Sequence, residues 1–416
     1  MRVSDPFDDV QVEKSKAILV GVAVLALIAL YAILFPAQGA LVAMIVAFFV
    51  IIMLHELGHL ILAKRSGMKV TEYFVGFGPR LWSFKKGETE YGLKAVPLGG
   101  YCRIIGMTNL EEVAPEDEPR AYRSKSWHAK VATAAAGPAV HFIIAIVLMF
   151  TVLFFAGDYR NEHATTNLST VTQGAQTAGL QPGDRVVSIN GSPVNSWDQV
   201  PSLINPRSHP AHAGDVVHIT VERGDVLLER DVVLQKSTEP GNEGRIVAGI
   251  GPHTVVPHPS LVSAVTDAPR QVADVSWESV KAIGSVFSPS GISNYFRILS
   301  GNQGSNTNQN QRFVSPVGFG QLANDAVKSG WVTAFGLLIA INVFVGLFNL
   351  LPLLPFDGGH IAIASYEKVA SWVRRKRVQV DVAKLMPLTV GVMAVLGFIF
   401  LSSLFLDITH PVANPF

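Results

Sequence analysis

The stretch that decides the fold is Met53-Leu54-His55-Glu56-Leu57-Gly58-His59, which lies near the end of an almost uninterrupted apolar run from Leu41 to Ala63. On a helix, His55 and His59 lie on one face, where both imidazoles can bind one zinc ion, and Glu56 is left free to act as a general base. Ionisable side chains are costly to bury in lipid, so their presence in this run requires a function. The pattern predicts a zinc peptidase whose active site lies inside a membrane.

The composition is that of a membrane protein with substantial loops. Of the 416 residues, 49% are hydrophobic and 16% are charged, and the mean hydropathy is +0.34. The formal net charge of +1 gives no indication of a nucleic-acid partner, and we expect none. The single cysteine, Cys102, excludes a disulfide within the chain and a cysteine-rich zinc site, and we expect its thiol to be inert.

Five apolar stretches are long enough to span or nearly span a bilayer, which takes about 20 residues each. The first, residues 17–35, follows an N-terminal tail (1–16). It is predicted to be an additional anchor helix and not a cleaved signal peptide, because Pro36-Ala37-Gln38-Gly39 is typical of a turn into the next helix. The other predicted membrane segments are residues 40–63, 131–156, 331–372 and 385–406.

Basic residues are concentrated in two connections between these stretches. One connection is residues 64–130, and the other carries Arg374-Arg375-Lys376-Arg377 before the last span. The positive-inside rule places both in the cytoplasm. We therefore expect a cytoplasmic N-terminus, an extracytoplasmic segment from 157 to 330 and an extracytoplasmic C-terminus.

Residues 66–106 are predicted to form strands and hairpins. Short, aromatic and partly alternating segments are separated there by glycine and Lys-Lys-Gly turns. At membrane depth, a sheet of this kind is tolerated only when buried in protein or lining a watery cavity, and its free edge could hold a substrate in extended form. An ordinary cytoplasmic hairpin is an equally good interpretation.

The composition of residues 165–250 is that of a soluble domain. The order of its turn and strand signals, beginning at Ala178-Gly179-Leu180-Gln181-Pro182-Gly183-Asp184, resembles a PDZ domain, which binds peptide ends at a sheet edge. Residues 251–330 should then contain an amphipathic helix over 262–287 and a mobile loop over 300–311. The helix is expected either on the membrane surface or against the preceding domain.

A catalytic zinc normally has three protein ligands, so a third ligand must come from elsewhere in the chain. The candidate is Asp357, which follows an apolar segment interrupted by Pro352 and Pro355. A broken helix with an acid inside a membrane is typical of a functional site. The alternatives are His360, Glu72, Glu88 and Glu90.

These motifs together resemble the site-2 protease family of intramembrane zinc metallopeptidases. The resemblance is greatest to its bacterial branch with a single PDZ domain, which includes the actinobacterial proteases of regulated intramembrane proteolysis. It covers the chain from about residue 40 to the C-terminus. Besides the His-Glu-x-x-His motif, it rests on Phe74-Val75-Gly76-Phe77-Gly78-Pro79, Gly87-Glu88-Thr89-Glu90-Tyr91-Gly92, Ala136-Gly137-Pro138, Ser315-Pro316-Val317-Gly318 and Asn349-x-x-Pro352-x-x-x-x-Asp357-Gly358.

The resemblance implies a role for each matching residue. His55, His59 and Asp357 would bind Zn²⁺, and Glu56 would be the catalytic acid and base. The residues implied in substrate binding are Asn349, Pro352, Gly76 and Gly78. The implied fold is a polytopic α-helical protein of the bacterial plasma membrane, with a membrane-associated β region and one extracytoplasmic PDZ domain.

The implied activity is cleavage of transmembrane segments of single-span proteins, such as anti-sigma factors after a first cleavage by another protease. The implied partners are these substrates, a peptide or substrate bound by the PDZ domain, and the lipid bilayer. Three alternatives are a protease that mainly clears remnant signal peptides, an inactive PDZ adaptor and a metal transporter. The chain departs from the family at His141, where an asparagine is common, and in the additional helix at 17–35. A lone histidine such as His141 is more often a packing residue than a ligand.

Overall fold

The computed structural model describes residues 36–206, 210–237, 244–301 and 312–410. The predicted tail (1–16) and anchor helix (17–35), and most of the predicted loop over 300–311, lie outside these residues. The chain divides into two compact units. We call Met1–Val152 together with Ser263–Phe416 the helical unit, and Leu153–Val262 the sheet unit.

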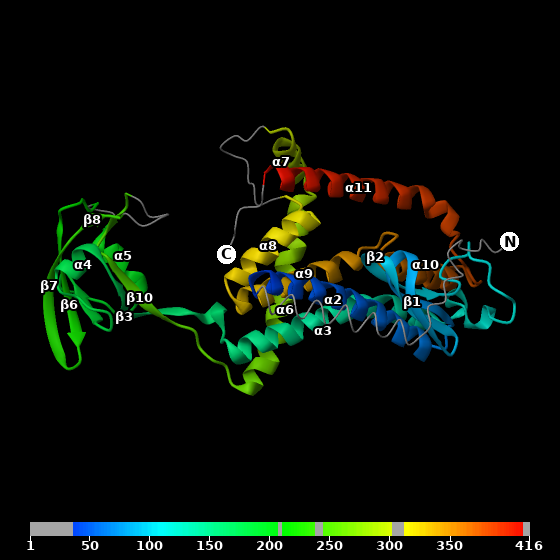
Figure 1. The fold of residues 1–416 in the computed structure, drawn as a ribbon, viewed down its shortest axis with the longest axis horizontal. Helices are drawn as coiled ribbons and strands as arrows, with labels where there is room; N and C mark the ends of the chain where they lie inside the picture. Colours follow the sequence, from blue (N-terminus) through cyan, green and yellow to red (C-terminus); the bar gives the residue numbers. More distant parts are fainter. Residues whose placement is uncertain (1–35, 207–209, 238–243, 302–311, 411–416) are drawn as a thin grey trace. The chain divides into compact units, whose positions relative to one another are not determined.

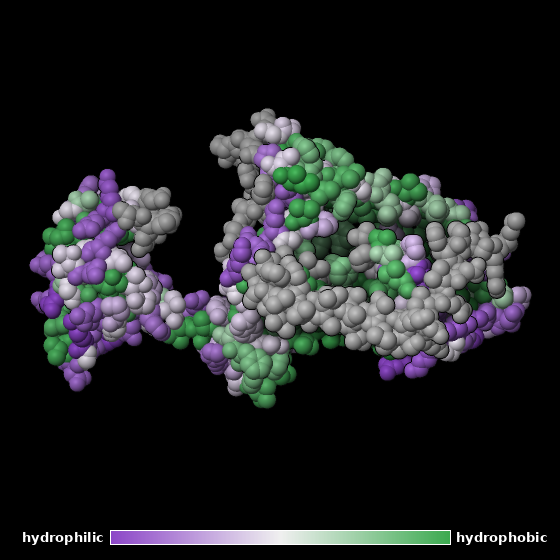
Figure 2. All heavy atoms as spheres, in the orientation of Figure 1, coloured by the Kyte–Doolittle hydropathy of each residue, from purple (hydrophilic) through white to green (hydrophobic). Residues whose placement is uncertain are grey.

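Four helical segments of the described chain are long and apolar enough to cross a membrane. They are the greater part of α2 (Pro36–Arg65), α3 (Trp127–Phe155), α9 (Trp331–Asn349), and α11 (Met386–Thr409) with the 3-10 turn η5 (Val382–Leu385) before it. Much of their apolar surface faces outward, and Figure 2 shows hydrophobic side chains gathered along α11. Large apolar side chains on the outside suit a lipid environment.

The core of the helical unit lies where α2, α3 and α9 pack together with two further helices. Met44 and Ile51 of α2 pack with Ala323 of α8 (Pro316–Lys328) and Leu338 of α9. On the other side of α9, Val272 of α6 (Leu261–Val286) packs with residues of α3 and α9. The buried face of α6 is therefore explained by helices of its own unit (Figure 1).

Two helices of this unit start at Ser-Pro pairs. Ser288 precedes α7 (Pro289–Leu299) and its side chain accepts a hydrogen bond from the backbone of Gly291. Ser315 precedes α8, and its side chain accepts from the backbone of Val317 and Gly318. Serine as N-cap followed by proline at the first helical position is a strong start signal, since it satisfies free N–H groups and fixes φ.

Strands β1 (Val70–Lys86) and β2 (Thr89–Ile104) form an antiparallel hairpin, the strand region predicted at 66–106. The hairpin is fixed to the C-terminal half of α2. Met68 and Val70 pack against Leu60 and Ala63 of that helix, and the hydroxyl of Tyr73 donates to the Met53 carbonyl at 2.7 Å. The sheet is thus held beside the His-Glu-x-x-His segment. Two 3-10 turns follow in the connection to α3, η1 (Glu118–Arg120) and η2 (Tyr122–Ser124).

The membrane segment predicted at 331–372, with its interruption at Pro352 and Pro355, consists of two helices. Helix α9 ends at Asn349, and α10 (Asp357–Arg374) begins at the candidate third ligand. Prolines in the turn cannot continue the hydrogen-bond ladder of α9. The turn then folds against the start of α10, where a Cβ atom at Gly358 would lie 2.3 Å from the Leu350 carbonyl oxygen. Glycine at this position allows Asp357 to begin a helix directly beside the end of α9.

The sheet unit is built on a strand order of β10-β3-β4-β6-β7, with β5 paired to β4 and a separate β8-β9 pair. Alternate residues such as Val217, Ile219 and Val221 are buried, and their neighbours along the strand are more exposed. This is the pattern of a soluble domain with one core. The elements are η3 (Tyr159–Asn161), β3 (His163–Val171), α4 (Gln173–Thr177), β4 (Arg185–Ile189), β5 (Ser192–Pro193), η4 (Trp197–Gln199), α5 (Val200–Ile204), β6 (Val216–Arg223), β7 (Val226–Val233), β8 (Gln235–Lys236), β9 (Ile246–Val247) and β10 (Ile250–Val255).

Candidate metal centre

Three side chains predicted to bind a metal lie together in the helical unit. His55 and His59 come from successive turns of α2, and Asp357 is the first residue of α10. The two Nε2 atoms are 3.2 Å apart, and Asp357 Oδ2 lies 3.3 Å from His55 Nε2 and 3.4 Å from His59 Nε2. Both imidazoles are buried, and the carboxylate is mostly buried. Two helices distant in sequence therefore present three ligand atoms to one point.

The spacing of these atoms fits a tetrahedral zinc site. Ligand atoms about 2.0 to 2.1 Å from a tetrahedral zinc lie about 3.3 to 3.4 Å from one another. The three measured separations, 3.2, 3.3 and 3.4 Å, are close to that edge length. Two imidazoles and one carboxylate are also a ligand set found in catalytic zinc sites, with a fourth position left for water or substrate.

The surroundings of His59 orient it as a ligand. Its Nδ1 atom lies 2.7 Å from the Thr133 carbonyl oxygen on α3, which can only accept a hydrogen bond. The proton of the neutral ring is therefore on Nδ1, and the Nε2 lone pair faces the cluster. Such a hydrogen bond to the far nitrogen is a general feature of metal-binding histidines.

The helix that faces the cluster leaves space for an ion because it carries a glycine there. A Cβ atom at Gly137 of α3 would lie 2.3 Å from His59 Nε2 and 2.6 Å from His55 Nε2. Any side chain at this position would occupy the space in front of the ligand atoms. The Ala136-Gly137-Pro138 motif thus contributes to the site by the absence of a side chain.

Glu56 lies beside both the cluster and the hairpin. Its carboxyl group interacts electrostatically with His55, His59 and Asp357. A Cβ atom at Gly100 of β2 would lie 3.3 Å from Glu56 Cγ. The glutamate thus lies near the candidate ligands on one side and near Gly100 of β2 on the other.

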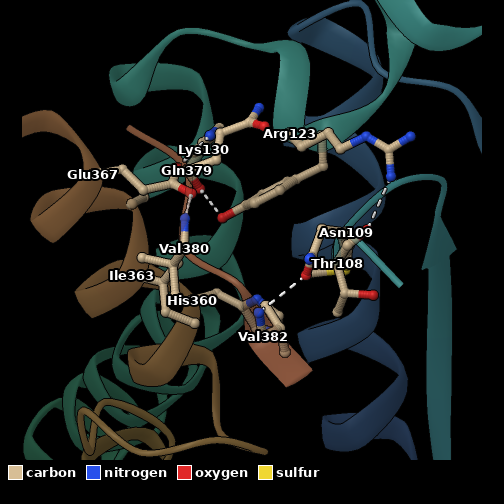
Figure 3. A pocket seen from close by; sticks show the side chains of 13 residues that line it. Thr108, Asn109, Arg123, Lys130, His360, Ile363, Glu367, Gln379, Val380 and Val382 are labelled. Carbon is tan, nitrogen blue, oxygen red and sulfur yellow. Dashed lines mark hydrogen bonds and ion pairs between the residues drawn. The ribbon is translucent and has the colours of Figure 1, made fainter. Parts of the chain in front are cut away.

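The alternative third ligands lie elsewhere. Figure 3 shows His360 pointing into a small cavity, where Asn109 and Val382 also lie. The cavity has a volume of about 30 Å³. Its ring centroid is 6.1 Å from that of Tyr122. The alternative glutamates are paired with other groups, Glu72 with Arg103 and Tyr101, Glu88 with Arg120, and Glu90 with Arg80. Asp357 is therefore the carboxylate that the structure places with the two histidines.

Cys102 lies on β2, where burial raises the pKa of its thiol to about 12. At neutral pH the sulfur therefore keeps its proton. The thiolate is the form that binds metals and attacks carbonyl groups, and the inertness of Cys102 stays a prediction.

The four residues predicted to bind substrate belong to three different parts of the helical unit. Asn349 is the last residue of α9. Pro352 lines an open cavity of about 410 Å³ between the α9–α10 turn and the start of α11. Gly76 and Gly78 lie on β1 with φ of +84° and +80°, where the pairing with β2 shifts register. Their roles in binding stay predictions.

Two polar residues near the cluster were not identified as a pair from the sequence. The ring centroid of His141 is 4.9 Å from that of His55, and His141 Nδ1 is 3.0 Å from Asn342 Oδ1. The available signals were weak. Asn342 is an amide in the middle of an apolar helix, and His141 lies four residues after Gly137, on the same face of α3.

Comparison with known proteins agrees with this geometry. The model of Peptidase family M50 matches residues 43–398. Zinc metalloprotease Rip1 of Mycobacterium tuberculosis is 34% identical over an alignment of 404 residues. The match covers 88% of this chain and 96% of that protein. Rip1 of Mycolicibacterium smegmatis is 33% identical over 405 residues, with the same shares covered.

Among solved structures, the PDZ domain of an SdrC-like protein from Listeria monocytogenes matches 22% of this chain and 88% of its own, with 21% identity and a TM-score of 0.18. The family model and the two Rip1 proteins, in contrast, cover most of the chain and include both halves of the metal cluster. The predicted family is confirmed, and the chain belongs to peptidase family M50, the site-2 protease family.

Proposed function

We propose that this chain, a site-2-type zinc metalloprotease of a bacterial membrane, holds its zinc with His55, His59 and Asp357 and uses Glu56 as the catalytic acid and base. The observation that carries the proposal is the meeting of three ligand atoms, 3.2 to 3.4 Å apart, from two distant helices. Their spacing supports zinc as the ion, and the position of His55 and His59 on an apolar helix supports a site within the membrane.

The chemistry divides between the metal and the chain. When bound, zinc would supply a Lewis acid for the scissile carbonyl group and make water easier to deprotonate. Glu56 takes a proton from the attacking water and returns it to the departing amine. His59 is held in position through its hydrogen bond to the Thr133 carbonyl, and Gly137 leaves room beside the ligand atoms.

The hairpin gives the substrate a place to bind in extended form. A helical peptide bond is shielded by its own backbone, so a membrane segment has to unwind before water can attack it. We propose that the unwound segment lies along the β1–β2 sheet, with Gly76 and Gly78 allowing close approach of its backbone. The contact of β2 with Glu56 at Gly100 supports this, because it places the sheet beside the general base. Asn349 and Pro352 would complete the substrate site from the end of α9.

The substrates we propose are single-span membrane proteins, such as anti-sigma factors that a first protease has already shortened. Membership of peptidase family M50, the site-2 protease family, supports a membrane protein as the substrate. The proposed orientation has the N-terminus in the cytoplasm and the C-terminus outside the plasma membrane. The sheet unit, also outside, would act as a PDZ domain that binds a peptide or substrate and controls access. Remnant signal peptides are the alternative substrate class. An inactive adaptor is disfavoured because all ligands and the base are present together.

The experiment compares the membrane proteins of cells that carry the parent enzyme or the Glu56→Gln variant. We expect shortened single-span proteins to accumulate with Glu56→Gln, because the glutamine can neither take nor return the proton. Glu278→Gln is the matched control, since Glu278 is exposed on α6. An identical set of membrane proteins in the parent and Glu56→Gln cells would contradict the proposal.

A further inference from the structure

A polar pair is buried between two of the membrane helices. His141 of α3 is 2% exposed and Asn342 of α9 is not exposed at all, and the two side chains are hydrogen-bonded at 3.0 Å. Polar groups in the apolar part of membrane helices are costly and commonly functional. The pair lies beside the metal cluster, because the ring centroids of His141 and His55 are 4.9 Å apart.

The hydrogen bonds of Asn342 determine which nitrogen of His141 carries the proton. Asn342 Nδ2 donates to the Leu338 carbonyl oxygen at 2.8 Å, so the Oδ1 atom is the one that faces His141. An amide oxygen can only accept a hydrogen bond. His141 Nδ1 must therefore be the donor, and the neutral ring carries its lone pair on Nε2.

His55 requires an acceptor for the proton on its Nδ1 atom. Its Nε2 atom is the one in the cluster, so its proton must be on Nδ1 when Nε2 binds a metal. That Nδ1 is buried and has no hydrogen-bond partner among the described residues. The corresponding atom of His59 has the Thr133 carbonyl as its acceptor. His59 is thus oriented by a hydrogen bond, whereas His55 has a buried N–H donor that still requires an acceptor.

We infer that His141 is the positioning residue for His55. When the metal is bound, His141 Nε2 accepts the hydrogen bond of His55 Nδ1–H, and Asn342 holds His141 in the tautomer that can accept it. The side chain of His141 points from the same face of α3 as Gly137, which lies in front of the ligand atoms. This chain of hydrogen bonds fixes the orientation of the His55 ring and makes its Nε2 a better ligand. The inference rests on the proposed role of His55 in zinc binding.

The other interpretation is that the pair only joins α3 to α9. A joint of that kind would affect the stability of the helical unit and leave the affinity for zinc unchanged. The positioning role predicts a change in zinc affinity that is larger than any change in stability can explain. The two interpretations therefore differ in a quantity that can be measured without following proteolysis.

The test measures the zinc dissociation constant of the full chain in detergent, by competition with a chelator of known affinity. We expect His141→Phe, which keeps an aromatic ring and removes both nitrogens, to weaken zinc binding about 10- to 100-fold. His141→Gln should bind zinc more tightly than His141→Phe, because its side-chain oxygen can accept from His55. His128→Phe is the matched control, since His128 is exposed at the start of the same helix.

Asn342→Leu provides a second route to the same answer, including the case in which His141→Phe does not fold. It should weaken zinc binding in the same direction, and the double variant should be no weaker than His141→Phe alone. Zinc affinities within about twofold of the parent for both single variants, with a lowered unfolding temperature, would overturn the inference in favour of a structural joint. His55→Ala separates this from the proposed function: if it keeps zinc, the metal site itself is wrong, and if it loses zinc while His141→Phe does not, only the positioning role is wrong.

Discussion

Asp184 of the sheet unit is buried and Asp357 of the helical unit is mostly buried, and these two aspartates have different partners. In the sheet unit, the Asp184 side chain is 1% exposed and binds the guanidinium of Arg223 through both oxygens, at 2.7 and 2.9 Å. It also accepts from the Gln181 backbone at 2.9 Å. In the helical unit, the ion-pair contacts of Asp357 within the described chain are with two imidazoles, at 3.3 and 3.4 Å.

The difference between these aspartates shows how a structural carboxylate is distinguished from a candidate metal ligand. The permanent positive charge of Arg223 compensates the charge of Asp184, and the Gln181 N–H adds a further hydrogen bond. Asp184 therefore needs no metal ion to balance its charge. The neighbours of Asp357 are the imidazoles of His55 and His59, which are uncharged when each carries one proton. In the part of the chain described, Asp357 Oδ2 also has no hydrogen-bond donor. A divalent cation would supply the missing positive charge.

The largest effect expected from this comparison is loss of zinc on replacing Asp357. Asp357→Asn removes the only charged ligand of the proposed site, and we expect the zinc content of the purified protein to fall below about one-tenth of equimolar, since a neutral amide is a poor zinc ligand. Elemental analysis after dialysis measures this. Asp184→Asn is the control and should keep its zinc. Full zinc occupancy in Asp357→Asn would contradict the assignment of Asp357 as a zinc ligand.

A smaller loss of zinc binding is expected when a side chain fills the space for the ion and all three ligands are left in place. Gly137→Ala puts a methyl group 2.3 Å from His59 Nε2, so either the ligands or α3 must shift. We expect zinc affinity and cleavage to fall about 10- to 100-fold. Gly336→Ala, at an open position on α9, is the matched control and should behave as the parent. Normal zinc affinity in Gly137→Ala would show that the site lies elsewhere.

The helical unit also contains a structural aspartate, Asp407, with which Asp357 can be compared. Asp407 of α11 is fully buried, lies 3.0 Å from Arg312 Nη2 and accepts from the Ser315 backbone at 2.7 Å. Asp407→Asn leaves Arg312 buried without a counter-charge and should lower the free energy of unfolding by about 3 kcal/mol. Denaturant unfolding measures this loss, and the zinc affinity should stay unchanged. A change in zinc affinity without a loss of stability would contradict the structural assignment.

The smallest expected effect is the pH dependence of the Asp184 pair. Hydrogen bonding to Arg223 holds the pKa of the Asp184 carboxyl below its usual range. A carboxyl whose folded pKa is lowered stabilises the fold above its unfolded pKa of about 3.9, and that stabilisation is lost as the pH falls through the folded value.

The change in stability is about 1.5 to 3 kcal/mol, the range for hydrogen bonds to a charged group. It can be followed by hydrogen exchange in the strands β4 and β6 of the full chain between pH 5 and 2. Asp184→Asn should remove this part of the acid dependence. Exchange in these strands that changes with pH equally in the variant and the parent would contradict the assignment.

The candidate metal ligands could be predicted from sequence because each has a strong local signal. His55 and His59 share a helix face at a spacing of four residues, and Asp357 follows two prolines in an apolar stretch. The family followed from these motifs together and is confirmed. The strand region at 66–106 was also visible in its alternation and turn residues.

The remaining features depend on which helices become neighbours, which a single sequence does not reveal. His141 and Asn342 are separated by about 200 positions and meet only because α3 packs against α9. The contribution of Gly137 is visible only when the ligand atoms are in place. The partners of α6 could not be chosen either, because its apolar face fits a membrane, a domain or other helices equally well. The predicted count of five spans stays a prediction, since residues 17–35 lie outside the described chain.

The most direct test of the central claim is to measure zinc content and cleavage together for one variant. The purified parent and Glu56→Gln proteins are placed in lipid vesicles with a single-span substrate, and bound zinc and the rate of cleavage are measured on the same samples. We predict equimolar zinc in both proteins and a cleavage rate about 10²- to 10⁴-fold lower in Glu56→Gln, because the proton can no longer be transferred. An unchanged cleavage rate in Glu56→Gln with zinc bound would contradict the account.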